Sequence, residues 1–130
     1  MFAALCDDDK YITEEIKKLL LEYAKDNRIT IDIDEFESGE ELLNSEKNYD
    51  IIVLDYQLGS TNGLTVAKEL RKRNVLSSII FLTSYPNFMI DAFEVNTFRF
   101  LLKPIDKSKF FKAIDDYIKI VDANYPITII

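Results

Sequence analysis

The chain has 130 residues, 48% of them apolar, which suits one domain with a hydrophobic core. Its formal net charge of −7 argues against a nucleic-acid-binding surface on this segment. With no histidine and one cysteine, Cys6, it excludes histidine catalysis, imidazole metal sites and an internal disulfide. It shows neither a membrane-spanning apolar run nor a signal-peptide pattern, so we expect a cytoplasmic protein.

The first quarter of the chain predicts a strand, a helix and a second strand. The apolar run 2–6 predicts a central strand that ends in Asp7-Asp8-Asp9. Apolar residues then recur at helical spacing over 12–23, and we expect Asp9 to cap this helix. Isoleucine alternates with polar residues over 29–34, a pattern typical of an edge strand.

A buried strand ending at Asp55 is the central prediction of the middle segment. Ser38 and Glu41 have the spacing of a capping box, which predicts a short helix after them. The unbroken apolar run 51–54 favours a strand buried on both faces of a parallel sheet. After a turn at Gly63, apolar spacing over 64–70 predicts a third helix.

The last third of the chain predicts two more strands and two more helices. The run 78–82 is apolar and ends at Thr83, and Pro86 suits the first turn of a fourth helix. Residues 98–102 predict a fifth strand, followed by Lys103-Pro104. Helical spacing over 110–121 predicts the last helix, with Asp106 as its cap.

Strands that alternate with helices predict an α/β fold with a parallel sheet and right-handed crossovers. Because the alternating second strand belongs on an edge, the expected (βα)5 arrangement is a doubly wound, flavodoxin-like five-stranded sheet of order 2-1-3-4-5. We expect one domain over residues 1–122. Residues 123–130 are expected to be a linker or the start of an output domain outside this chain.

Polar residues follow four neighbouring strands, the first, third, fourth and fifth: Asp7 and Asp8, Asp55, Thr83, and Lys103. The carboxyl ends of parallel strands meet at one edge of the sheet, where ligands bind in such folds. Carboxylates about 5 Å apart repel by roughly 3 kcal/mol per pair at an effective dielectric near 20. Lysine and a divalent cation would offset this repulsion, and an all-oxygen site favours Mg²⁺. Asp55 could then act as a nucleophile toward a phosphoryl group.

Each residue also has a purely structural interpretation. Asp9 and its neighbours could serve only as helix caps, Thr83 could simply end its strand, and Lys103 could be a solvated surface lysine. The functional hypothesis depends on their joint occurrence at four neighbouring strand ends.

Together these motifs resemble the receiver domain of bacterial two-component response regulators over essentially the whole chain. The motifs that carry the resemblance are Leu5-Cys6-Asp7-Asp8-Asp9, Ile52-Val53-Leu54-Asp55, Phe81-Leu82-Thr83-Ser84 and Leu102-Lys103-Pro104. Residues 93–104 are similar to the subgroup whose output is a LytTR-type DNA-binding domain. The resemblance implies a phosphoacceptor signalling domain that catalyses only its own phosphotransfer and slow dephosphorylation, and is otherwise not an enzyme.

The resemblance also implies a role for each site residue. Asp55 would accept phosphate from a sensor histidine kinase. Asp8, Asp55 and the backbone carbonyl of Gln57 would bind Mg²⁺, with Asp7 acting mainly through a water molecule. Lys103 would pair with the phosphoryl group and Thr83 would be the switch hydroxyl.

Some features depart from or qualify the family pattern. The switch aromatic position falls on Phe100, which has no hydroxyl, so any switch there would act by packing alone. No acid or amide stands in a clear position to speed dephosphorylation, although Gln57 could influence the hydrolytic water. The Lys103-Pro104 bond is often cis in the family.

The resemblance implies a switch whose output surface is the fourth helix, fifth strand and fifth helix. Its expected residues are Asp91, Phe98 or Phe100, Arg99 and Lys109. A homodimer would form there on phosphorylation, and DNA would be bound only through an output domain outside this chain. No membrane partner is expected.

Other classes remain open at this point. The domain could be a stand-alone receiver that acts by protein–protein interaction. An aspartate-nucleophile phosphohydrolase of the haloacid dehalogenase type would need an acid where Gln57 stands. A flavodoxin-like FMN protein would place a phosphate on an acidic edge without a Gly/Ser/Thr-rich loop. A P-loop NTPase is excluded because the Gly-x-x-x-x-Gly-Lys run is absent.

Overall fold

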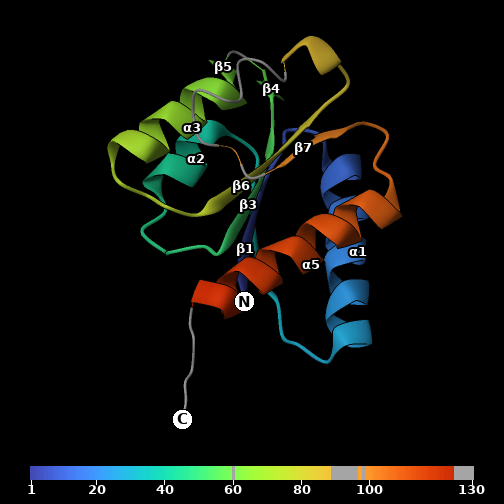
Figure 1. The fold of residues 1–130 in the computed structure, drawn as a ribbon. Coiled ribbons are helices and arrows are strands. Elements are labelled where there is room, and N and C mark those ends of the chain that lie inside the picture. The colour runs from blue at the N-terminus through green and yellow to red at the C-terminus, as the bar shows by residue number, and fades with distance from the viewer. Residues whose placement is uncertain (60, 89–96, 98, 125–130) are drawn as a thin grey trace.

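The structure, a computed structural model, describes residues 1–59, 61–88, 97 and 99–124. Strands and helices alternate along the chain (Figure 1). In order they are β1 (Phe2–Cys6), α1 (Lys10–Asn27), β2 (Asp32–Phe36), α2 (Gly39–Asn44), β3 (Ile51–Asp55), β4 (Gln57–Leu58), β5 (Thr61–Asn62), α3 (Gly63–Lys72), β6 (Ser78–Thr83), the 3-10 turn η1 (Pro86–Phe88), β7 (Arg99–Leu102) and α5 (Lys107–Asn124).

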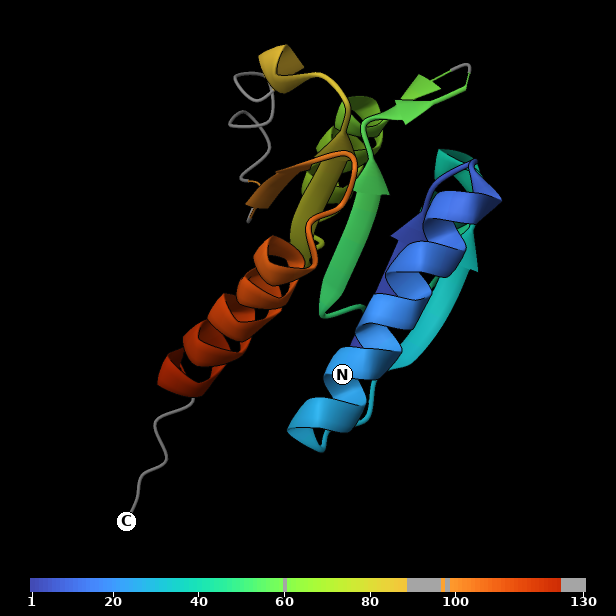
Figure 2. The same cartoon turned by 90° about the vertical axis from the view of Figure 1, so that its right-hand side faces the viewer.

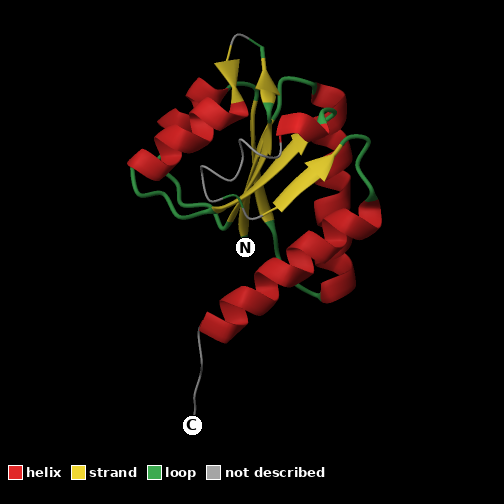
Figure 3. Cartoon of the chain, turned by 45° about the horizontal axis from the view of Figure 1, so that its top comes forward, coloured by secondary structure: helices red, strands yellow, loops and turns green. Residues whose placement is uncertain are grey.

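Five strands form one parallel sheet in the order β2-β1-β3-β6-β7. Since β6 and β7 are the predicted fourth and fifth strands, this is the expected order 2-1-3-4-5. The register aligns Cys6 with Leu54, Asp55 with Leu82, and Thr83 with Leu102. The carboxyl ends of the strands therefore lie along one edge of the sheet, toward which the arrowheads of the five strands point in Figure 2; Figure 3 shows the strands in yellow between the red helices.

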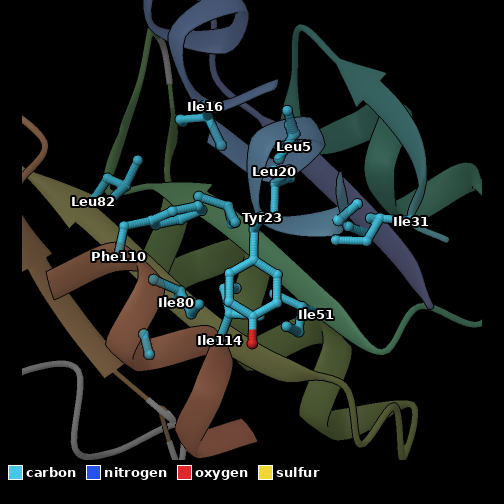
Figure 4. Packing of buried hydrophobic residues seen from close by; sticks show 14 residues of the cluster. Leu5, Ile16, Leu20, Tyr23, Ile31, Ile51, Ile80, Leu82, Phe110 and Ile114 are labelled. Atoms are coloured by element: carbon cyan, nitrogen blue, oxygen red, sulfur yellow. The ribbon is translucent and has the colours of Figure 1, made fainter. Parts of the chain in front are cut away.

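Helices cover both faces of the sheet and create two separate cores. On one face α2 and α3 contribute Leu42, Val66 and Leu70, which pack on alternate residues of the central strands. On the other face α1 and α5 lie in front of the sheet in Figure 2. Their apolar side chains interdigitate over the strands in Figure 4, where Ile16, Leu20, Tyr23, Phe110 and Ile114 meet Leu5, Ile51, Ile80 and Leu82. Burial on both faces explains the unbroken apolar runs of β1, β3 and β6.

The second strand lies on the sheet edge as predicted, but its predicted bounds are wrong. The pattern placed it over 29–34, whereas β2 spans Asp32–Phe36. Pairing begins where Phe2 aligns with Asp32, and residues 28–31 connect α1 to this point. Ile31 is buried in this connection before the strand begins, so its apolar character reports burial rather than strand pairing.

The predicted helix caps are confirmed. Asp9 Oδ1 accepts from the Tyr11 N–H at 2.9 Å, and Asp106 Oδ1 accepts from the Lys109 N–H at 3.1 Å. Ser38 Oγ accepts from the Glu41 N–H, while the Glu41 carboxylate reaches back to the Glu37 N–H rather than to that of Ser38 itself.

Two local features differ from or limit the sequence prediction. Residues 57–62, treated as a loop, include the antiparallel hairpin β4–β5, which projects beyond the end of β3 (Figure 2). Where the fourth helix is predicted to begin, Pro86–Phe88 form the 3-10 turn η1, and the rest of that prediction, residues 89–96, lies outside the described residues. Among the helices described, none is long and apolar enough to cross a membrane.

Candidate functional site

Asp7, Asp8 and Asp55 form one acidic cluster at the carboxyl ends of β1 and β3. Carboxylate oxygens of the three residues all lie within 4.8 Å of one another. Asp7 and Asp55 are 4% and 5% exposed, while Asp8 is open to solvent. The predicted juxtaposition of these three carboxylates is therefore present in the folded chain.

Lys103 reaches the same cluster from the end of β7. Its Nζ lies 3.2 Å from Asp55 Oδ1 and 3.4 Å from Asp7 Oδ2. The side chain is only 18% exposed, so it is not a solvated surface lysine. The bond that follows it, Lys103-Pro104, is cis, as the resemblance implied.

Backbone groups fix the two buried carboxylates. The Asp9 N–H donates to Asp7 Oδ1 at 2.8 Å, and the Gln57 N–H donates to Asp55 Oδ1 at 3.2 Å. The loop that carries Gln57 is held in turn by Gly63, whose N–H donates to the Tyr56 carbonyl at 2.6 Å. A Cβ on Gly63 would lie 2.4 Å from the Asp55 carbonyl oxygen, so only glycine permits this close approach.

The electrostatics of the cluster favour an added cation. Burial and the Asp7 carboxylate raise the pKa of Asp55 to about 6, although Lys103 and the Gln57 N–H oppose this shift. Burial lowers the pKa of Lys103, but Asp55 and Asp7 outweigh it and the net shift is upward. One ammonium cannot compensate three carboxylates. Their carboxylate oxygens form a hard, anionic donor set at the carboxyl ends of β1 and β3, and such a set fits Mg²⁺.

Thr83 ends β6 beside this cluster and is 1% exposed. Its Oγ1 accepts from the Tyr85 N–H at 3.2 Å, and its carbonyl accepts from the Lys103 N–H at 2.7 Å. A hydroxyl that accepts one bond keeps its own hydrogen to donate. Thr83 is thus hydrogen-bonded both to Lys103, which follows β7, and to Tyr85 in the segment after β6.

The remaining predicted residues lie further out. Gln57 is exposed in β4, with its backbone beside Asp55. Phe100 is half-buried in β7, with its ring 6.5 Å from that of Phe81. Arg99 pairs with Asp116 of α5 at 2.8 Å, and Asp91 and Phe98 lie outside the described residues.

Sequence reasoning missed several groups that shape the site. The hairpin β4–β5 was not expected, and neither was the capping of α3 by Asn62, whose Oδ1 accepts from the Thr65 N–H at 2.9 Å. The Asn62-Gly63 pair was the available signal, since asparagine is a favoured helix cap. The ring of Tyr56, stacked on that of Phe88, was also missed.

The family model for the response regulator receiver domain matches residues 3–115. The chain belongs to this family. Receiver domains are phosphoacceptor signalling modules rather than enzymes, and a single match over most of the chain removes the basis for the phosphohydrolase and FMN-binding alternatives.

Curated relatives of this receiver domain include two sensory transduction proteins. LytT of Bacillus cereus is 34% identical over 120 residues, which cover 92% of this chain and 48% of the relative. LytR of Staphylococcus epidermidis is 32% identical over 117 residues, covering 88% and 45%. The chain therefore spans about half the length of the curated relatives it matches.

Solved structures agree with the receiver fold. The response regulatory domain of mrkE from Klebsiella pneumoniae superposes with a TM-score of 0.83 at 21% identity, over 95% of this chain and 99% of that one. Response regulator TrrA from Thermotoga maritima, solved in complex with Mg²⁺-BeF, gives a TM-score of 0.77 at 28% identity, over 89% and 97%.

Proposed function

We propose that this receiver domain accepts a phosphoryl group on Asp55 from a sensor histidine kinase, in a reaction that needs Mg²⁺. The observation that carries the proposal is the placement of Asp55. It is a buried carboxylate with a raised pKa, within reach of two further carboxylates and the Lys103 ammonium. Such a group is held in place for attack but is poorly compensated until a cation binds.

Asp8 and Asp55 would hold Mg²⁺ directly, together with the backbone carbonyl of Gln57, and Asp7 would act through a water molecule. Bound Mg²⁺ supplies charge neutralisation for the transferring phosphoryl oxygens. The solved complex of TrrA with Mg²⁺-BeF supports this assignment by relationship. The exposed Asp8 beside two buried acids also leaves one side of the cluster open to solvent, where an ion and its waters can enter.

The transfer itself requires little beyond placement and charge. An Asp55 oxygen attacks phosphorus as the bond from phosphorus to the kinase imidazole nitrogen breaks, and that nitrogen keeps the electron pair. Lys103, already 3.2 Å from Asp55 Oδ1, would stabilise the phosphoryl oxygens. The Thr83 hydroxyl would donate to one of them and act as the switch. Gln57, exposed beside the site, could influence the water that later hydrolyses the phosphoaspartate.

Phosphorylation would shift the domain between two conformations by binding one of them better. The expected output surface includes β7 and α5, with Arg99, Phe100 and Lys109, and the homodimer would form there. The curated relatives are sensory transduction proteins about twice as long as this chain, which leaves room for an output domain. From the resemblance of residues 93–104, we propose that this output is a LytTR-type DNA-binding domain that regulates transcription. We assign residues 1–122 to the receiver and 123–130 to a linker or the start of that domain, acting in the cytoplasm. A stand-alone receiver that acts by protein–protein contact is the alternative.

Intact-mass measurement after incubation with acetyl phosphate and Mg²⁺ tests this function. We expect one added phosphoryl group on the wild-type chain, none on Asp55→Asn and none when a chelator removes the metal. Asp50→Asn, at the other end of β3, is the matched control and should keep the adduct. If no adduct forms and Mg²⁺ with beryllofluoride also fails to bind, the domain is not a phosphoacceptor.

A further inference from the structure

Five aromatic rings form a continuous series beside the acidic cluster, and the proposed function uses only the last of them. The centroids of Tyr85 and Phe88 are 5.8 Å apart, those of Phe88 and Tyr56 are 4.3 Å, and those of Tyr56 and Phe81 are 5.6 Å. Phe81 lies 6.5 Å from Phe100. The Tyr56–Phe88 contact is the closest of these and the only parallel one, with an interplanar angle of 11°.

Tyr56 directly follows the proposed phosphoacceptor and is held on every side. Its N–H donates to the Leu82 carbonyl at 2.9 Å, its carbonyl accepts from the Gly63 N–H, and it is 5% exposed. Its ring contacts those of Phe81 and Phe88. A shift of the Asp55 backbone cannot leave this ring in place, because the two residues share a peptide bond and tightly packed surroundings.

Phe88 is joined to Thr83 by a second, separate route. The Tyr85 N–H donates to Thr83 Oγ1 at 3.2 Å, and the Phe88 N–H donates to the Tyr85 carbonyl at 3.3 Å. The rings of Tyr85 and Phe88 also meet edge to face. The Thr83 hydroxyl is therefore connected through Tyr85 to the turn η1 that carries Phe88, so a movement of this hydroxyl toward a group on Asp55 can be passed to the turn.

We propose that the Tyr56–Phe88 stack holds the segment after β6 in its unphosphorylated arrangement, and that phosphorylation of Asp55 must separate the two rings. This inference rests on the proposed function and names Tyr56 and Phe88 as positioning residues for its switch. Both routes from the site end on the same ring pair. Tyr56 is tied to Asp55 and Phe88 is tied to Thr83, so a rearrangement of either site residue changes how the two rings overlap.

Thermodynamic linkage predicts the direction in which loss of the stack changes the affinity for a phosphoryl mimic. If the stack exists only in the unoccupied state, breaking it by mutation favours the occupied state and tightens binding of a phosphoryl mimic. An aromatic pair contributes about 0.5–1.5 kcal/mol, which corresponds to roughly twofold to tenfold in affinity.

The test is a titration of the 130-residue chain with beryllofluoride at saturating Mg²⁺, followed by the amide NMR shift of Gln57. We expect Phe88→Leu to bind the mimic about threefold or more tightly than wild type. Tyr56→Leu should act in the same direction, and Tyr56→Phe, which keeps the ring, should bind like wild type. Phe111→Leu is the matched control and should leave the affinity unchanged, because its half-buried ring meets Tyr23 edge to face on the opposite face of the sheet.

Phe88 is half-buried, so its replacement by leucine keeps the test available if Tyr56→Leu does not fold. Unchanged or weaker binding by Phe88→Leu overturns the proposal while leaving the phosphoacceptor function intact. Equal tightening by Phe111→Leu also overturns it, because the effect would then be a general loosening of the packing rather than loss of this ring pair. If the wild-type chain binds no mimic, the proposed function and this inference fall together.

Discussion

The two ends of β3 each carry an aspartate, and their surroundings are opposite. Asp50, just before the strand, accepts hydrogen bonds from the Phe2 N–H at 2.7 Å and from the Tyr117 hydroxyl at 3.3 Å. Asp55, at the other end, shares the Lys103 ammonium with Asp7 and also lies beside the Asp8 carboxylate, and its pKa is raised. Asp50 is satisfied by neutral donors and ties β1 and α5 to β3. Burial and the neighbouring acids make the charged form of Asp55 unfavourable, as is common for reactive side chains in functional sites.

The largest expected effect comes from replacing Lys103, the cationic side chain beside Asp55. Lys103→Met should slow phosphorylation by acetyl phosphate about a hundredfold, because a charge that stabilises the transferring group is lost. The measurement is the rate of adduct formation by intact mass. Lys107→Met is the control, since Lys107 pairs with Glu22 on the surface and is more than half exposed. Equal rates in the two variants would remove Lys103 from the transfer step.

The pH dependence of stability should separate the two aspartates. Because the pKa of Asp55 rises from 3.8 to about 6 on folding, its proton stabilises the metal-free fold at low pH. That contribution is fully present below pH 4 and is lost as the pH rises through 6. With the metal chelated, Asp55→Asn should therefore exceed wild type in free energy of unfolding at pH 8, by on the order of 2–3 kcal/mol.

Urea unfolding at pH 4.5 and pH 8 measures this difference, which should fall to about a third at the lower pH. Asp50→Asn should show no such gain at pH 8, because its carboxylate accepts two hydrogen bonds rather than facing other acids. A stabilisation of both variants at pH 8 would mean that net charge, and not local crowding, is the cause.

A smaller effect, on Mg²⁺ affinity, should follow from replacing Asp8, the exposed carboxylate of the cluster. Asp8→Asn removes one of the two carboxylates proposed to bind Mg²⁺ directly, so Mg²⁺ affinity should fall by about tenfold, or 1.4 kcal/mol. Calorimetric titration with Mg²⁺ checks this, again with Asp50→Asn as the unaffected partner. Wild-type affinity in Asp8→Asn would place the ion elsewhere.

The smallest effect belongs to the satisfied end of the strand. Tyr117→Phe deletes the hydroxyl that donates to Asp50 and should lower the free energy of unfolding by about 0.5–1 kcal/mol. Its rate of phosphorylation should equal that of wild type. A slowed reaction would show that the two ends of β3 are coupled.

Much of this arrangement could be predicted because it depends on patterns along the chain. The apolar runs of β1, β3 and β6 and the residues that follow them place Asp7, Asp55 and Thr83 at one edge of the sheet. The start of β2 could not be predicted in this way, since isoleucine alternation continues through a buried connection that contains Ile31. Burial and strand pairing both select apolar residues, and only pairing with β1 decides where the strand begins.

Contacts between distant residues were beyond the reach of the sequence. The Tyr56–Phe88 stack joins residues after two different strands, and neither residue has a local pattern that indicates the other. The raised pKa of Asp55 likewise depends on burial by the whole fold. Sequence reasoning thus located the reactive residues but not the packing that would connect them to a response.

The acidic edge strand has a consequence for how copies of this protein can meet. β2 lies at the border of the sheet, where open backbone groups invite another strand, and it carries Asp32, Asp34 and Glu35. Lys47 and Lys17 pair with Asp34 and Glu35, so pairing two such borders edge to edge would have to rearrange these ion pairs or bring the acids of both copies together. Charged side chains of this kind discourage edge-to-edge polymerisation and fibril growth at the border. Specific self-association is therefore expected on other faces of the domain than β2. A signalling protein with such a protected edge strand can reach high concentration without aggregating through it.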